Sequence, residues 1–211
     1  MDKDSTVWRL LACLVLVFST AQSITATGSE IIRDRLPLVH VLFVCTGNIC
    51  RSPTAERLAA AYAAQSGIPE LVASSAGTHA VIGHPIHRDA AVVLGNLGGD
   101  ASDFAARQLK PKLASAADLI ITMTSAQRDI VLETAPRQLQ RTFTLTEASR
   151  LASMEGAQTV ADLAALRPHL GPNDRSDIPD PIGQSPEVFA AIGAQIAELL
   201  PPLLELCRRS G

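Results

Sequence analysis

Aromatic residues are scarce in this 211-residue chain, in which one Trp, one Tyr and five Phe make up 3% of the sequence. Runs of basic residues are also missing, and the formal net charge is −3. A nucleic-acid-binding surface combines clustered Lys and Arg with aromatic side chains on which bases stack. The sequence therefore excludes nucleic acid as a partner.

Cysteine is scarce as well, with four residues at Cys13, Cys45, Cys50 and Cys207. Their spacing does not form the paired C-x2-C pattern of a structural zinc site. Four cysteines in a chain of this length are also too few for a disulfide framework. The sequence thus predicts a domain stabilised by its apolar core, without a structural metal.

Residues 39–53 are the segment that indicates a chemical function. Apolar and β-branched residues predict a strand at 39–44 that is buried on both faces of a parallel sheet. The loop that follows contains Gly47 and Asn48, the residue types that best tolerate left-handed backbone angles. Ser52 is a favourable helix N-cap and Pro53 suits the first helical position. A tight loop is therefore expected between a buried strand and a helix N-terminus.

This loop predicts an anion site with a nucleophile beneath it. Inward-facing N–H groups of this loop would add to the positive end of the helix dipole, and Arg51 would donate two parallel hydrogen bonds. Cys45 lies at the base of this field, which stabilises a thiolate, and Ser52 is placed to donate to it. A thiolate and an arginine around a phosphoryl group predict covalent transfer to sulfur. A C-x5-R spacing alone also occurs by chance, but the strand, turn and helix start favour chemistry.

Residues 44–56, VCTGNICRSPTAE, resemble the active-site loop of the low-molecular-weight protein tyrosine phosphatases. Residues 74–78, 106–108 and 117–123 are similar to later segments of that family in the same order. The resemblance implies that Cys45 attacks phosphorus and forms a phosphocysteine. It also implies that Asp180 protonates the leaving oxygen and then activates the water that hydrolyses the intermediate.

The same resemblance implies how the phosphate is held. Asn48 and Ser52 support the loop and the thiolate, and neither a metal nor an organic cofactor is needed. The implied partner is a phosphorylated protein, for instance a tyrosine kinase or its target. The implied phosphate-binding residues are Thr46, Gly47, Asn48, Ile49, Cys50 and Arg51.

The residues alone give Asp180 weaker support. It lies in the polar, Pro-rich stretch 172–181, which is typical of a surface loop, and such loops often carry functional groups. Asp174 and Asp177 lie in the same stretch. Without the resemblance, any of the three could be a solvated loop charge.

The chain departs from the family around the expected cleft. Many members carry aromatic residues that stack on the phosphotyrosine ring, whereas residues 78–85 offer only His79 and His84, and residues 181–183 read Pro-Ile-Gly. Either histidine could partly replace an aromatic or be an ordinary polar loop residue. Family members often have a histidine, bonded to the loop Asn and Ser, where this chain has Phe104. Asn48 must therefore be held by another group or by water.

These departures leave three functions open. Phosphotyrosine-specific members resemble this chain in carrying Ile at position 49, whereas protein-arginine phosphatases carry Thr there. The main interpretation is therefore a protein-tyrosine phosphatase. The less aromatic walls leave a protein-arginine phosphatase as a second interpretation. Together with Phe104, they leave a phosphate-binding pseudo-enzyme as a third.

The remaining cysteines bear on redox chemistry. Cys50 lies close to Cys45 on the loop, so it is either a partner for a reversible protective disulfide or an inert buried thiol. Thioredoxin-coupled arsenate reductases resemble this loop closely, but they need a further pair of relay cysteines downstream. Only Cys207 lies beyond Cys50, which argues against that activity.

Residues 1–37 do not match the family, and the phosphatase-like domain is expected at 38–211. The apolar core at 10–18 is short for a membrane span and fits a signal-peptide core, followed by small residues such as Ala21 and Ala26. Either residues 10–26 export or anchor the protein, or the start is assigned too far upstream. We expect a cytoplasmic enzyme that contacts a membrane only if this segment is real.

Alternating β and α patterns predict an α/β fold: a single doubly wound domain with a four-stranded parallel sheet and helices on both faces. The nucleophile loop would follow the first strand, at the edge where such folds bind ligands. Pro201-Pro202 predicts a kink or break before 203–209. The predicted strands are 39–44, 71–75, 119–123 and 142–145. The predicted helices are 53–65, 88–97, 101–108, 111–116, 126–133, 147–153, 160–166 and 186–200.

Overall fold

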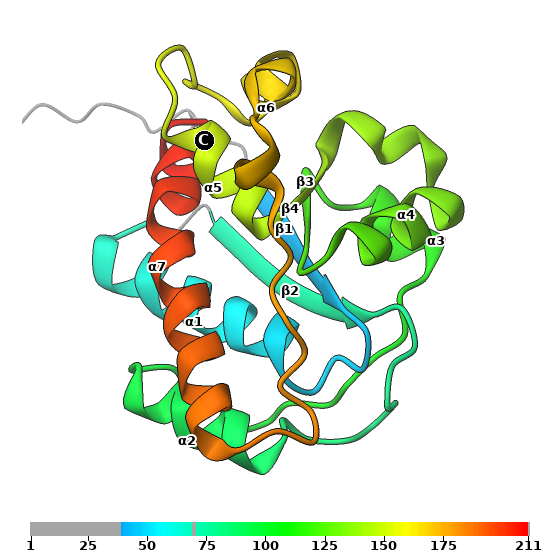
Figure 1. Cartoon of the computed structure of the whole chain (residues 1–211), viewed down its shortest axis with the longest axis vertical. Helices are drawn as coiled ribbons and strands as arrows, with labels where there is room; N and C mark the ends of the chain where they lie inside the picture. Colours follow the sequence, from blue (N-terminus) through cyan, green and yellow to red (C-terminus); the bar gives the residue numbers. More distant parts are fainter. Residues whose placement is uncertain (1–38, 69–70, 211) are drawn as a thin grey trace, which may run out of the picture. The chain divides into compact units, whose positions relative to one another are not determined.

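Four parallel strands form one sheet in the order β2-β1-β3-β4, which confirms the predicted doubly wound α/β fold (Figure 1). The computed structural model describes residues 39–68 and 71–210. The export or anchoring segment predicted within residues 10–26, and the domain boundary predicted after residue 37, lie outside the described residues. The strands are β1 (Val39–Cys45), β2 (Leu71–Gly77), β3 (Leu119–Thr122) and β4 (Thr142–Thr144).

The strand order reverses between β1 and β3. The chain passes from β1 to β2 on one side and then crosses over to β3 and β4 on the other. In such sheets the loops after the two central strands diverge at the carboxyl edge and leave a crevice where ligands bind. β1 ends at Cys45, so the predicted nucleophile lies at this crevice.

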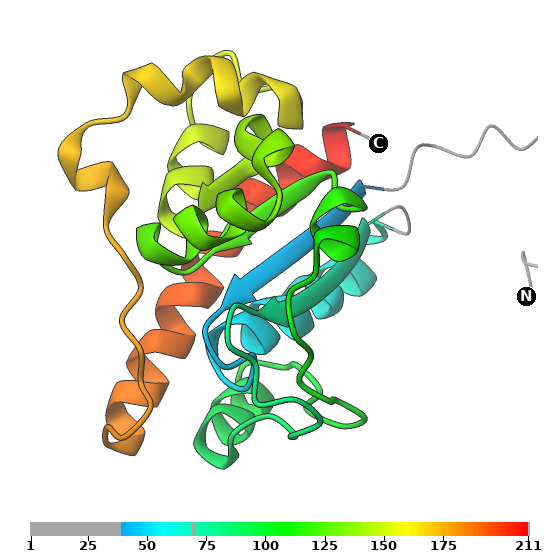
Figure 2. The same cartoon turned by 90° about the vertical axis from the view of Figure 1, so that its right-hand side faces the viewer.

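Helices cover both faces of the sheet (Figure 2). Along β1, Val41 and Phe43 join a core shared with α1, α2, α5, α6 and α7, whereas Leu42 and Val44 join a core shared with α3 and α4. This alternation follows from the two-residue repeat of a strand. The helices are α1 (Arg51–Ser66), α2 (Arg88–Asn96), α3 (Pro111–Ser115), α4 (Ser125–Thr134), α5 (Leu145–Ala152), α6 (Val160–Leu166) and α7 (Pro186–Ser210), with 3-10 turns at Pro136–Arg141, Arg167–His169 and Pro172–Arg175.

α7 continues through Pro201-Pro202, so the predicted break is wrong. Its buried residues recur on both sides of the prolines, including Ile196, Leu200 and Leu204, and the helix packs against α1, α2 and α5. Burial of this apolar face offsets the intrahelical hydrogen bonds that the prolines cannot donate. α7 is long and apolar enough to cross a membrane, but its contacts with the core account for that character.

The helix predicted at 101–108 does not form, because neighbouring segments take its backbone groups. The Ala106 N–H donates to the His84 carbonyl at 2.8 Å, and the Ala106 carbonyl accepts from the Gly83 N–H at 2.8 Å. The Arg107 N–H donates to the Asn48 side chain at 2.8 Å. These long-range bonds replace the i to i−4 bonds of a helix and bring this segment against the nucleophile loop.

α1 begins at Arg51, two residues before the predicted start, and Cys50 is its N-cap. The prediction that Ser52 caps the helix is therefore wrong. The Ser52 hydroxyl bonds the Cys45 sulfur and the Asn48 side chain instead of a helical N–H. This earlier start places Arg51 in the first helical turn.

We predict that Gly77→Ala lowers the free energy of unfolding by about 1–3 kcal/mol, because the added methyl overpacks the end of β2. A Cβ there would lie 2.5 Å from the Thr46 carbonyl oxygen and 3.0 Å from Ala80. Gly95→Ala is the matched control, since a Cβ at this α2 position meets nothing within 4 Å and Ala favours the helix. Urea unfolding of both variants tests this, and equal stabilities would contradict it.

Candidate active site

The carbonyl groups of the Cys45 loop point outward, toward the segment between β2 and α2. Asn48 adopts the left-handed backbone that turns the chain, with φ 56°, whereas Gly47 does not. With the carbonyls bonded outside, the N–H groups of the loop face the interior of the curl, which is an anion-binding arrangement. The carbonyls of Cys45, Thr46, Gly47 and Ile49 accept from the N–H groups of Thr78, His79, Val81 and His87 at 2.9, 2.9, 3.0 and 2.7 Å.

The Cys45 sulfur lies at the base of this curl. It is 3.0 Å from the Ser52 hydroxyl and accepts from the Asn48 N–H at 3.3 Å. The Asn48 side-chain NH2 donates to Ser52 Oγ at 3.0 Å, so Ser52 accepts there and keeps its own proton. Of the acceptors for that proton, the sulfur is nearer than the Ala76 carbonyl at 3.5 Å. Ser52 is therefore placed to donate to the Cys45 sulfur.

Two groups hold Asn48, for which the sequence predicted support from a residue other than Phe104 or from water. Its NH2 donates to Ser75 Oγ at 2.8 Å, and its carbonyl oxygen accepts from the Arg107 N–H at 2.8 Å. Ser75 in turn donates to the Glu56 carboxylate. The predicted need for other support is thus met by protein groups, and the Asn48 side chain is fully buried.

Arg51 joins the loop to a distant part of the chain. Its guanidinium, 4% exposed, donates to the Ile178 carbonyl at 3.0 Å and forms an ion pair with Asp180. Ile178 is fully buried, and its N–H donates to the Met123 carbonyl at 2.8 Å, just beyond β3. This anchor fixes the loop that carries Asp180, 129 positions away from Arg51 in the sequence.

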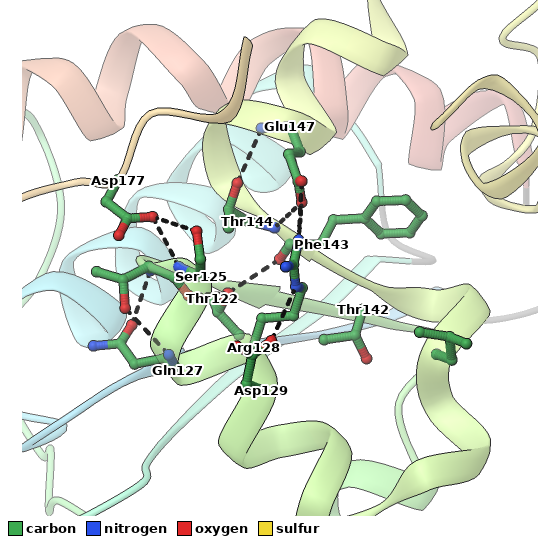
Figure 3. Close-up of polar contacts among 12 residues, drawn as sticks. Thr122, Ser125, Gln127, Arg128, Asp129, Thr142, Phe143, Thr144, Glu147 and Asp177 are labelled. Atoms are coloured by element: carbon green, nitrogen blue, oxygen red, sulfur yellow. Dashed lines mark hydrogen bonds and ion pairs between the residues drawn. The ribbon is translucent and has the colours of Figure 1, made fainter. Parts of the chain in front are cut away.

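The structure distinguishes the three aspartates of this stretch. Asp174 pairs with Arg150 at 3.3 Å, away from the loop. Asp177 accepts from the Ser125 N–H and hydroxyl at 2.8 and 2.9 Å, at the start of α4 (Figure 3). Asp180 contacts Arg51, and its side chain is 46% exposed at the mouth of the site. Of the three, Asp180 is the carboxylate placed beside the anion loop.

A pocket of about 270 Å³ opens above Cys45. Ile49, Val81 and Ile182 form its apolar walls, and neither Phe, Tyr nor Trp lines it among the described residues. Thr46, Arg51, His79 and Asp180 also border an adjoining pocket of about 440 Å³ beside α4. The expectation of a less aromatic cleft is therefore confirmed. The predicted site residues that line the smaller pocket are Cys45, Thr46, Gly47, Ile49, Cys50, Arg51 and Asp180, while Asn48 and Ser52 lie buried beneath it.

The sequence model of the family described as "Low molecular weight phosphotyrosine protein phosphatase" matches residues 40–162. The chain belongs to this family. Low molecular weight protein-tyrosine-phosphatase Etp of Escherichia coli K12 is 38% identical over 109 residues, which are 52% of this chain and 70% of Etp. A protein-arginine-phosphatase of Geobacillus stearothermophilus is 31% identical over 166 residues, which are 79% of this chain and 94% of that relative.

Solved structures of family members share the fold. The YwlE arginine phosphatase from Geobacillus stearothermophilus gives a TM-score of 0.61 at 30% identity, covering 79% of this chain and 91% of that one. The Erwinia amylovora tyrosine phosphatase AmsI gives a TM-score of 0.62 at 26% identity, covering 80% and 92%. An arginine phosphatase and a tyrosine phosphatase are therefore both similar to this chain.

Several residues that build the site escaped sequence reasoning. Ser75, Glu56 and the Arg107 backbone hold Asn48, but nothing local distinguishes them from ordinary polar positions. Ile178 left a usable signal, because it is a lone large apolar residue within a polar loop. Thr124 and Gln127 fit the capping-box pattern that marks a helix start, but that pattern does not predict the bond from the Gln127 side chain to Thr46 at 3.0 Å.

Cys50 and Cys207 are buried free thiols. Burial, followed by the neighbouring Cys45 charge, raises the pKa of Cys50 to about 12. Burial also raises the pKa of Cys207 to about 12. Both groups therefore stay protonated at neutral pH. A reversible Cys45–Cys50 disulfide stays a prediction. Within residues 39–68 and 71–210, no three His, Cys, Asp or Glu side chains are grouped to hold a metal ion.

We predict that iodoacetamide at neutral pH alkylates Cys45 and spares Cys50 and Cys207. A thiol reacts as its thiolate, and with a pKa of about 12 almost no thiolate of Cys50 or Cys207 is present at neutral pH. Peptide mapping by mass spectrometry, in a Cys13→Ser background, measures the site of labelling. Inorganic phosphate should slow the reaction, and labelling of Cys50 before Cys45 would contradict the assignment.

Proposed function

We propose that this chain hydrolyses phosphotyrosine in proteins through a phosphocysteine intermediate on Cys45. The observation that carries the proposal is the meeting of three groups at one pocket. Cys45 lies at its base, the loop carbonyls are bonded to the segment between β2 and α2, and Arg51 contacts Asp180 at its mouth. Family membership supports the same reaction class.

In the first step, the Cys45 thiolate attacks phosphorus. The P–S bond forms while the bond from phosphorus to the tyrosine oxygen breaks, and Asp180, in its acid form, gives its proton to that oxygen. Arg51 and the loop N–H groups hold the phosphoryl oxygens, whose charge must be stabilised in the transition state. The contact with Ser52 holds the sulfur at the base of the loop.

In the second step, Asp180 takes a proton from water and the water oxygen attacks phosphorus. The P–S bond breaks, which regenerates the thiolate and releases inorganic phosphate. In the free enzyme Asp180 is paired with Arg51. A bound phosphoryl group competes for that guanidinium and releases the carboxyl group for proton transfer, while the bond from Arg51 to the Ile178 carbonyl keeps the loop in place.

The walls of the pocket bear on which phosphorylated side chain enters. Ile49, Val81 and Ile182 offer aliphatic surface that suits the faces of a flat tyrosine ring by dispersion contacts. The family resemblance links Ile at position 49 to phosphotyrosine. The proposed partner is therefore a tyrosine-phosphorylated protein, such as a tyrosine kinase or its target.

A protein-arginine phosphatase is the second candidate. Two observations favour it: the pocket walls lack Phe, Tyr and Trp among the described residues, and an arginine phosphatase is similar over 79% of this chain. The long aliphatic stem of phosphoarginine also suits apolar walls.

We predict that purified full-length protein hydrolyses a phosphotyrosine peptide at least about tenfold faster, in kcat/KM, than the matched phosphoarginine peptide. Cys45→Ser should reduce both rates by more than about 10³-fold without loss of the folded structure, because an alcohol at this site is a far weaker nucleophile than a thiolate. Phosphate release and circular dichroism provide the measurements. The reverse preference would establish the arginine activity, and phosphate binding without turnover would establish a pseudo-enzyme.

We predict that Asp180→Asn lowers kcat/KM by about 10²–10⁴-fold for aryl phosphates with basic leaving groups, and much less for acidic ones, which leave without a proton. A plot of log kcat/KM against leaving-group pKa should thus become steeper. Asp177→Asn is the matched control, because it lies in the same loop and keeps an acceptor for Ser125. An equal loss for every leaving group would remove Asp180 from the acid role.

A further inference from the structure

Gln127 lies on the first turn of α4 and is buried, with 4% of its surface exposed (Figure 3). Its side-chain oxygen accepts from the backbone N–H groups of Met123 and Thr124 at 3.0 and 3.1 Å. Both neighbours can only donate, so the orientation of the amide is fixed and its NH2 group must face the other way. That NH2 group donates to Thr46 Oγ1 at 3.0 Å.

This bond determines what the Thr46 hydroxyl can do. Because the Gln127 NH2 has no lone pair to offer, Thr46 must accept from it, and the single hydroxyl proton has to point elsewhere. Thr46 is exposed and lines both pockets beside Arg51 and Asp180. Within the described residues, no protein acceptor takes this proton, and the Asp180 carboxylate already accepts from Arg51 and from the Ile182 N–H.

We propose that the Thr46 hydroxyl donates a hydrogen bond to a phosphoryl oxygen of the substrate, and that Gln127 is the positioning residue that directs it there. The inference rests on the proposed function only in that a phosphoryl group occupies the loop. A free threonine side chain samples several staggered rotamers. The Gln127 bond selects one of them before substrate arrives, so the donor is preorganised for the charge that spreads over the phosphoryl oxygens.

A purely structural role for Gln127 gives a different result. Its oxygen fastens the turn between β3 and α4, so its loss could weaken the fold without acting through Thr46. A double-mutant cycle separates the two roles, because a residue that acts through Thr46 has no further effect once the Thr46 hydroxyl is gone. Urea unfolding of each variant records the structural part independently.

The experiment compares Thr46→Val, Thr46→Ser, Gln127→Met and the Thr46→Val/Gln127→Met double variant, all in the full-length protein. Thr46→Val should lower kcat/KM for p-nitrophenyl phosphate, and the calorimetric affinity for inorganic phosphate, by about 10- to 150-fold, the range of one hydrogen bond to a charged group. Thr46→Ser should stay within about threefold of the parent. Gln127→Met should cost about 3- to 10-fold alone, and less than about twofold in the Thr46→Val background.

Three results would overturn the proposal. One is a Thr46→Val protein that matches the parent in both turnover and phosphate affinity. Another is a Gln127→Met effect of equal size in both backgrounds, which would mean that Gln127 acts through the fold. The third concerns the comparison of Thr46→Ser with Thr46→Val, which remains available if Gln127→Met does not fold. A loss of activity in Thr46→Ser as large as in Thr46→Val would show that the hydroxyl is not the phosphate donor. Weaker phosphate binding by Thr46→Val in a protein without turnover would support this inference while refuting the proposed function.

Discussion

The buried side chain of Asn48 is the contact on which the site depends. One amide joins the nucleophile loop to β2 through Ser75 and to the segment after α2 through the Arg107 backbone. It also fixes the direction in which Ser52 donates, and so the environment of the Cys45 sulfur. Each buried polar group of an amide that loses its partner lowers the free energy of unfolding by about 1–3 kcal/mol. The Cys45 loop, β2 and the segment that contains Arg107 therefore stabilise one another.

Arg51 extends this organisation to the far end of the chain. Its place in the first turn of α1 follows from the early helix start, and its two partners come from the loop anchored by Ile178. The same guanidinium therefore serves as a structural tie and as the proposed phosphate ligand. Because Arg51 has both roles, the Cys45 loop also positions Asp180, the proposed acid, which lies far away in the sequence.

Local sequence patterns predicted the elements whose formation depends on neighbouring residues. The strands, most helices and the Cys45 loop could be predicted, because periodicity, turn residues and a specific motif act within a few positions. The helix expected at 101–108, the cap expected at Ser52 and the break expected at Pro201-Pro202 were wrong, since distant contacts override local preference in each case. Asp180 needed the family resemblance. Gln127 and Ser75 contribute to the site through bonds to residues far along the chain, Thr46 and Asn48, and no local pattern predicts those contacts.

The aliphatic walls have a consequence for how this protein can evolve. Ile49, Val81 and Ile182 come from three separate segments, and their side chains are not part of the Cys45–Ser52–Asn48 network or of the Arg51–Asp180 pair. Exchange of a single wall residue would reshape the entrance while the bond-breaking apparatus stays intact. Substrate preference can thus change through substitution of one wall residue at a time, while the residues of the hydrolytic step stay the same.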